Sequence, residues 1–217
     1  MNDFTLTKVE KIFFNFFTIL FHPLLMPSYT IASILLLYSH YIFFNPLAVK
    51  MLLTVFFLMT AVIPLIVMAF MYYFHLISSF YLPLKEERII ISATITVFYF
   101  FTFYLLRGTF IPSYIFIFII AMPMISFALL LMQFLIPKIS IHTYAIGSLL
   151  GVLVFYRFIT IMVSPAYILL SAIFASGIII SARLLLKAHD TREVFSGFLT
   201  GMIISFFCMY ISNGYII

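Results

Sequence analysis

Long apolar runs, separated by short groups of charged residues and prolines, make up nearly all of this 217-residue sequence. A helix of about 20 apolar residues crosses the roughly 30 Å hydrocarbon layer of a bilayer. The runs therefore predict an all-α integral membrane protein, a polytopic bundle of six or seven transmembrane helices. The predicted spans are residues 24–44, 51–74, 89–106, 113–136, 142–156, 166–186 and 194–217. We expect the short fifth span to continue past Arg157.

The segment before the first predicted span, residues 11–21, has two interpretations. It is either an amphipathic helix in the membrane interface or a helix joined to the first span across a kink at Pro23 and Pro27. No short apolar region with a small-residue cleavage site follows the start, so we expect no cleaved signal peptide. No repeat or linker of soluble-domain size interrupts the sequence. Residues 1–217 are therefore interpreted as one transmembrane domain, in which 1–23 form the N-terminal helix.

Composition excludes a water-soluble fold. Hydrophobic residues make up 66% of the chain and charged residues 8%, whereas soluble domains carry about 25% charged residues. An outer-membrane barrel would alternate polar and apolar residues, but stretches such as 115–121 are apolar at every position. The net charge of +5 comes from basic residues scattered singly between spans, which argues against a nucleic-acid partner. The single cysteine, Cys208, cannot form an internal disulfide.

Most ionisable residues fall at one end of the predicted bundle. With seven spans, alternate connections share a face, so the N-terminus lies beside residues 78–88, 137–141 and 187–193. An ionisable group within a span costs about 2.5 to 3.5 kcal/mol on insertion scales, so such groups commonly line a polar cavity or an interface. The polar residues gathered at this end are Lys85, Glu86, Glu87, Arg88, Lys138, Ser140, His142, Arg183, Lys187, His189, Asp190, Arg192 and Glu193. Two histidines, several cations and carboxylates predict a phosphate-handling site.

The spacing around His189 suits nucleophilic chemistry. Residues four apart share a helix face, so Glu193 is predicted to accept a hydrogen bond from one ring nitrogen of His189 and leave the other free for attack. Arg183 precedes His189 by six residues, so a helix end or turn must separate them if both contact one anion. The alternative is a pair at a helix start whose charges lie in headgroup water.

These residues resemble the type 2 phosphatidic acid phosphatase superfamily. One family motif reads Ser-Arg, five residues, His, three residues, Asp. Here Arg183, His189 and Glu193 keep the spacing from Arg to His to carboxylate, while Ala182 is inserted after Ser181 and Glu replaces Asp.

Two further motifs complete the resemblance, which covers residues 85–217. The family's Pro-Ser-Gly-His element resembles the segment 139–142, which keeps Ser140 and His142. The family's element of Lys, six residues, Arg-Pro has its nearest counterpart in Lys85 and Arg88, which are three residues apart and lack the following Pro.

The resemblance implies a mechanism for phosphoryl transfer. His189 would attack phosphorus, His142 would protonate the leaving oxygen, and Glu193 would orient His189. Positive groups aimed at developing negative charge commonly contribute most to such a reaction. The groups that would bind the phosphoryl oxygens are Arg183, Ser140, Lys85 and Arg88. The implied mechanism requires no metal or other cofactor. The sequence also has no zinc-site spacing, glycine-rich phosphate loop or nucleophile elbow, so those enzyme classes are not expected.

Other histidines and glycines are interpreted structurally. His22, His40 and His75 lie near predicted span ends beside Phe or Tyr, where an interfacial aromatic belt explains them. The small-residue pairs at 147 and 151 and at 197 and 201 predict close approach of helices within the molecule.

The preferred function is a membrane phosphatase or phosphotransferase, with membrane lipids around it and a lipid or polyprenyl phosphate as substrate. The alternative is an inactive relative that binds lipid phosphate or serves as a subunit of a membrane complex. A solute transporter ranks third because the charges lie at span ends. The predicted location is the bacterial cytoplasmic membrane. Its sidedness stays open, since the basic residues favour a cytoplasmic site whereas bacterial members of the family commonly act on the outer side.

Overall fold

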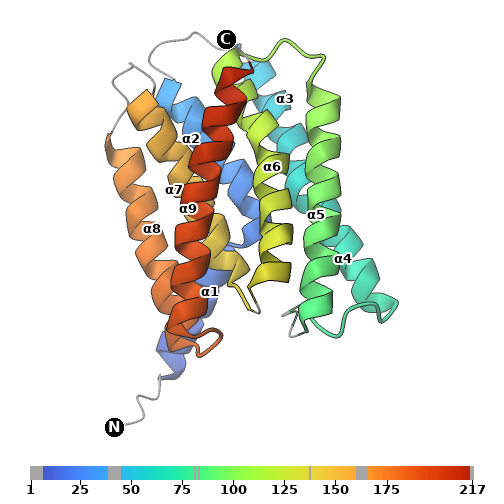
Figure 1. Ribbon diagram of the computed structural model, residues 1–217, viewed down its shortest axis with the longest axis vertical. Coiled ribbons are helices and arrows are strands. Elements are labelled where there is room, and N and C mark those ends of the chain that lie inside the picture. Colours follow the sequence, from blue (N-terminus) through green and yellow to red (C-terminus); the bar gives the residue numbers. More distant parts are fainter. Residues whose placement is uncertain are drawn as a thin grey trace.

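The computed structural model describes residues 7–38, 45–80, 82, 84–136, 138–159 and 166–215, and these parts contain helices and no strand. The helices lie side by side as a bundle (Figure 1). Their bounds are α1 Lys8–Leu20, the 3-10 turn η1 Pro23–Leu25, α2 Met26–Tyr38, α3 Pro46–Phe57, the π-helical turn η2 Leu58–Val62, α4 Ile63–Tyr73, α5 Lys85–Leu106, α6 Ser113–Leu135, α7 Ile141–Ile159, α8 Ala166–Leu185 and α9 Thr191–Gly214.

Within the described residues, seven helical segments are long and apolar enough to cross a membrane, which agrees with the upper of the two predicted numbers. Two of them are composite: α1, η1 and α2 form the first, and α3, η2 and α4 form the second. The second begins earlier than predicted because Asn45 caps α3 and Pro46 occupies its first turn, where a missing N–H costs nothing. The fifth runs past Arg157, as expected.

The N-terminal segment is broken at Phe21 and His22, and both interpretations of residues 11–21 stay predictions. Helix α1 ends at Leu20, His22 caps the short turn η1, and α2 continues from Met26. Pro23 and Pro27 occupy the starts of η1 and α2, because proline fits a first helical turn and disrupts an interior one. Predicted residues 39–44 of the first span lie outside the described residues.

Helices α7 and α9 approach closely through glycines, as the small-residue pairs predict. A Cβ atom on Gly147 would lie 2.3 Å from the carbonyl oxygen of Phe198, and one on Gly201 would lie 2.2 Å from that of Tyr144. No side chain fits such a gap, so glycine is what allows the two backbones to meet. This contact fixes the start of α7 against the start of α9.

Helix α1 begins at one end of the bundle and α9 ends at the other (Figure 1). The connections from α4 to α5, α6 to α7 and α8 to α9 all lie at the end where the chain begins. The prediction that these connections lie at one end of the bundle is therefore confirmed. The candidate site lies at this end.

Candidate functional site

The end of α8 brings Arg183 toward His189. The N–H of Ala188 donates to the carbonyl of Arg183 at 3.2 Å, and that of Lys187 donates to Leu184 at 3.0 Å. Lys187, which lies in the chain between Arg183 and His189, has a positive φ of 53°. This pattern, with a left-handed residue after the last turn, is a Schellman cap. It supplies the helix end that the six-residue spacing requires.

The start of α9 orients His189. The Asp190 side chain accepts the backbone N–H of Glu193 at 2.8 Å, and the Glu193 carboxylate accepts that of Asp190 at 3.3 Å, which forms a capping box. The same carboxylate lies 2.7 Å from Nδ1 of His189. The predicted hydrogen bond is thereby confirmed. With the Nδ1 proton donated to the carboxylate, Nε2 keeps its lone pair.

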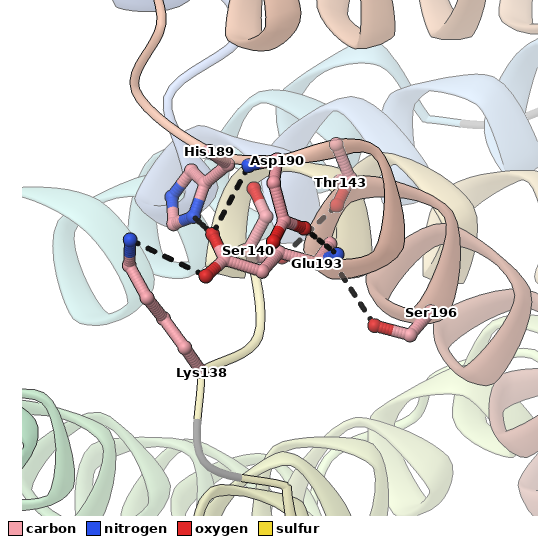
Figure 2. A network of polar contacts seen from close by, with 7 residues as sticks. All are labelled: Lys138, Ser140, Thr143, His189, Asp190, Glu193 and Ser196. Carbon is pink, nitrogen blue, oxygen red and sulfur yellow. Dashed lines mark hydrogen bonds and ion pairs between the residues drawn. The ribbon is translucent and has the colours of Figure 1, made fainter.

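The segment between α6 and α7 also contacts Glu193, through Lys138 and Ser140. The Lys138 ammonium lies 3.3 Å from Oε1 of Glu193, and the backbone N–H of Ser140 donates to the Glu193 carbonyl at 3.3 Å. Figure 2 shows the carboxylate between the His189 ring and Lys138. The predicted groups around residues 140 and 189 are therefore joined through Glu193.

Among the described residues predicted for the site, three side chains each have a buried polar atom without a hydrogen-bond partner. These atoms are Oγ of Ser140, Nε2 of His142 and Nε of Arg183. Arg183 and His189 lie close enough to His142 to interact with its ring electrostatically. A buried polar atom without a partner costs about 1 to 3 kcal/mol, so these atoms are expected to be used by a ligand. Their donor chemistry suits an anion.

The local environment favours a neutral His189. Burial is the main cause that lowers the pKa of His189 below its ordinary value of 6.5, and the positive charges of Arg183 and Lys138 act in the same direction. The hydrogen bond and the charge of Glu193 oppose this shift. The imidazole is therefore uncharged at neutral pH, the form that a nucleophile needs.

The remaining predicted ligands, Lys85 and Arg88, begin α5 at the same end of the bundle. Arg88 is buried, with 8% of its surface exposed, and its neighbour Glu87 accepts the backbone N–H of Ser78 at 2.6 Å. Within the described residues, no hydrogen bond or ion pair joins Lys85 or Arg88 to His142, Arg183 or His189. Their role as phosphate ligands stays a prediction.

Two residues join the site without having been assigned to it from the sequence. Lys138 forms an ion pair with Glu193. Its position in the connection between α6 and α7, at the end of the bundle where charged residues gather, could have indicated this role from the sequence. His22 places its ring 5.6 Å from that of His142, centroid to centroid. No spacing in the sequence connects residues 120 positions apart. His75 is exposed at the end of α4, and His40 lies outside the described residues.

An apolar cavity adjoins the histidines. About 80 Å³ in volume, it lies between α2, α5, α6 and α7, and its lining includes Pro23 and Ile141, the chain neighbours of His22 and His142. Three hydroxyl groups in its wall donate to backbone carbonyls of their own helices, at 2.8 Å for Thr30, 3.0 Å for Ser126 and 2.8 Å for Ser148. The wall is thus apolar in effect and suits a hydrocarbon chain.

In the part of the chain that the structure describes, no group of three or more His, Cys, Asp and Glu side chains is arranged to hold a metal ion. Comparison with protein-family models, with curated proteins and with solved structures finds no match to this chain.

Proposed function

We propose that this protein is a membrane phosphatase or phosphotransferase that acts on a lipid-linked phosphate through a phosphohistidine, as the resemblance to the type 2 phosphatidic acid phosphatases implies. The observation that carries the proposal is the group of three buried, unpartnered atoms on Ser140, His142 and Arg183. They lie beside a histidine whose carboxylate partner leaves Nε2 available. Buried donors without a partner favour a bound anion, and the adjacent nucleophile favours its transfer.

The proposed reaction proceeds in two steps. Nε2 of His189 forms a bond to phosphorus while the bond from phosphorus to the leaving oxygen breaks, and His142 gives that oxygen a proton. Water then attacks phosphorus and returns a proton to His142, and the bond to His189 breaks. Arg183 balances the charge on the phosphoryl oxygens in both steps.

A lipid substrate is supported by the apolar cavity. Its lining includes the chain neighbours of His22 and His142, so a phosphate held beside His142 has an apolar wall close to its hydrocarbon chain. The hydroxyl groups of Thr30, Ser126 and Ser148 in that wall already donate to backbone carbonyls. A hydrocarbon chain there leaves these three groups satisfied.

The test is phosphate release by the purified protein from a panel of lipid and polyprenyl phosphates. His189→Ala is expected to lower the rate at least about a thousandfold, because it removes the nucleophile. His75→Asn is the control, since His75 is exposed, lies at the same end and has φ 58°, which Asn tolerates. It should leave the rate unchanged.

Equal rates for the wild type and His189→Ala would exclude the phosphohistidine. If the wild type releases no phosphate yet retains a lipid phosphate in a manner that Arg183→Ala abolishes, the protein is a binding relative rather than an enzyme.

A further inference from the structure

His22 lies at the break between α1 and α2, in an orientation that the backbone fixes. It is the N-cap of η1, with φ −63° and ψ 140°. Its Nδ1 accepts the backbone N–H of Leu24 at 3.3 Å. A nitrogen that accepts a hydrogen bond carries no proton, so the neutral ring carries its proton on Nε2. The cap thus sets both the direction and the tautomer of the ring.

The ring of His22 meets that of His142 edge to face. The two ring centroids are 5.6 Å apart and the planes cross at 85°. Helix α1 packs against α8, and η1 packs against α7, so the helices that carry Arg183 and His142 hold the break in place. Since Nε2 of His142 has no hydrogen-bond partner, the ring contact with His22 helps to orient the His142 imidazole.

We infer that His22 is a positioning residue for the proton donor His142, an inference that rests on the phosphoryl transfer proposed above. In the first step of that reaction the leaving oxygen loses its bond to phosphorus and takes a proton from His142. A proton donor that is displaced by about 1 Å loses much of its effect. His22 therefore acts on the leaving-group side, away from the carboxylate that orients His189.

A capping role alone does not account for a histidine here. Asn, Asp, Ser and Thr are the side chains that cap helix starts best, and none of them reaches the neighbouring ring as an imidazole does. Asn is thus the discriminating replacement. Its Oδ1 can accept the N–H of Leu24, while the ring contact with His142 disappears.

The experiment compares two phosphate esters with the full-length purified protein. One is a lipid phosphate, whose leaving alkoxide needs a proton, and the other is nitrophenyl phosphate, whose leaving group needs little help. For His22→Asn we expect kcat on the lipid phosphate to fall about ten- to a hundredfold with KM unchanged, and kcat on the aryl ester to change less than about twofold. His142→Ala should show the same dependence on the leaving group.

Two controls complete the design. The double variant His22→Asn/His142→Ala should be no slower than His142→Ala alone, because two residues that act through one proton donor are not additive. His75→Asn makes the same change outside the site and should leave both rates unchanged. If His22→Asn does not purify as a folded protein, His22→Gln is measured against the same criteria.

Equal losses on both esters would show a structural role for His22 and overturn the inference, as would no loss on either. In both cases the wild type is active, so the proposed function stands. A wild type that releases phosphate from neither ester removes the proposed function, and this inference with it.

Discussion

The Glu193 side chain serves three partners at once. It accepts the backbone N–H of Asp190 at 3.3 Å, lies 2.7 Å from Nδ1 of His189 and lies 3.3 Å from the Lys138 ammonium. The pKa of His189 reflects this balance, because the carboxylate raises it while burial and the charges of Arg183 and Lys138 lower it. The protonation state of the proposed nucleophile is therefore set in part by Glu193 and Lys138, two side chains with no contact to the substrate in the proposed reaction.

Two substitutions at this carboxylate and its lysine should move the pH profile of kcat/KM in opposite directions. The proposed reaction requires neutral His189, so its rate should fall as pH drops through the pKa of that ring, which burial places below 6.5. Glu193→Gln removes a group that raises this pKa and should shift the acid limb to lower pH, with a rate loss of at least about a hundredfold. Lys138→Met removes a group that lowers it and should shift the limb to higher pH. Shifts of the same sign, measured on one substrate, would contradict this assignment.

At the scale of elements, the contact between α7 and α9 places the two halves of the site. Ser140 and His142 come from the start of α7, and Glu193 from the first turn of α9. Backbone contact at Gly147 and Gly201 holds these starts together.

Gly201→Ala should separate the two helices. The new methyl group would lie 2.2 Å from the carbonyl oxygen of Tyr144, and such overpacking costs about 1 to 3 kcal/mol. We expect the thermal midpoint of the purified protein in detergent to fall by several degrees. Gly177→Ala is the matched control, since nothing lies within 4 Å of its added Cβ and Ala favours a helix over Gly. A midpoint that falls equally in both variants would refute close packing at Gly201.

The sequence predicts the helices better than it predicts contacts between residues that are far apart along the chain. Apolar runs and prolines place the helices, because each is a local property of the chain. The pair His189 and Glu193 is equally local, four residues apart on one turn, and its hydrogen bond was predictable. The contact of His22 with His142 depends on how η1 packs against α7, which no local pattern encodes. The positions of Lys85 and Arg88 depend on packing in the same way.

At the scale of the molecule, charge is distributed unevenly between the two ends. The basic residues at the end with the site are Lys8, Lys11, Lys85, Arg88, Lys138, Arg183, Lys187 and Arg192, against Lys50, Arg107 and Arg157 toward the other. Such asymmetry commonly fixes the orientation of a membrane protein.

Seven crossings require that the two ends face different compartments. In a Cys208→Ala background, Ser78→Cys reports on the end with the site and Thr109→Cys on the opposite end, since both positions are exposed in loops. We expect an impermeant maleimide to label one of the two in intact cells and both after permeabilisation. The cysteine that reacts in intact cells identifies the compartment of the site. Labelling of both in intact cells would contradict seven crossings.

The capping box at the start of α9 also bears on the thermal stability of the candidate site. The carboxylate that closes the first turn of that helix is also the one that holds His189. Helix ends open more readily than helix interiors, so the geometry of the proposed site depends on one of the less stable turns of a long helix. On warming, the proposed phosphate-release activity should therefore be lost at a lower temperature than the helix content of the bundle.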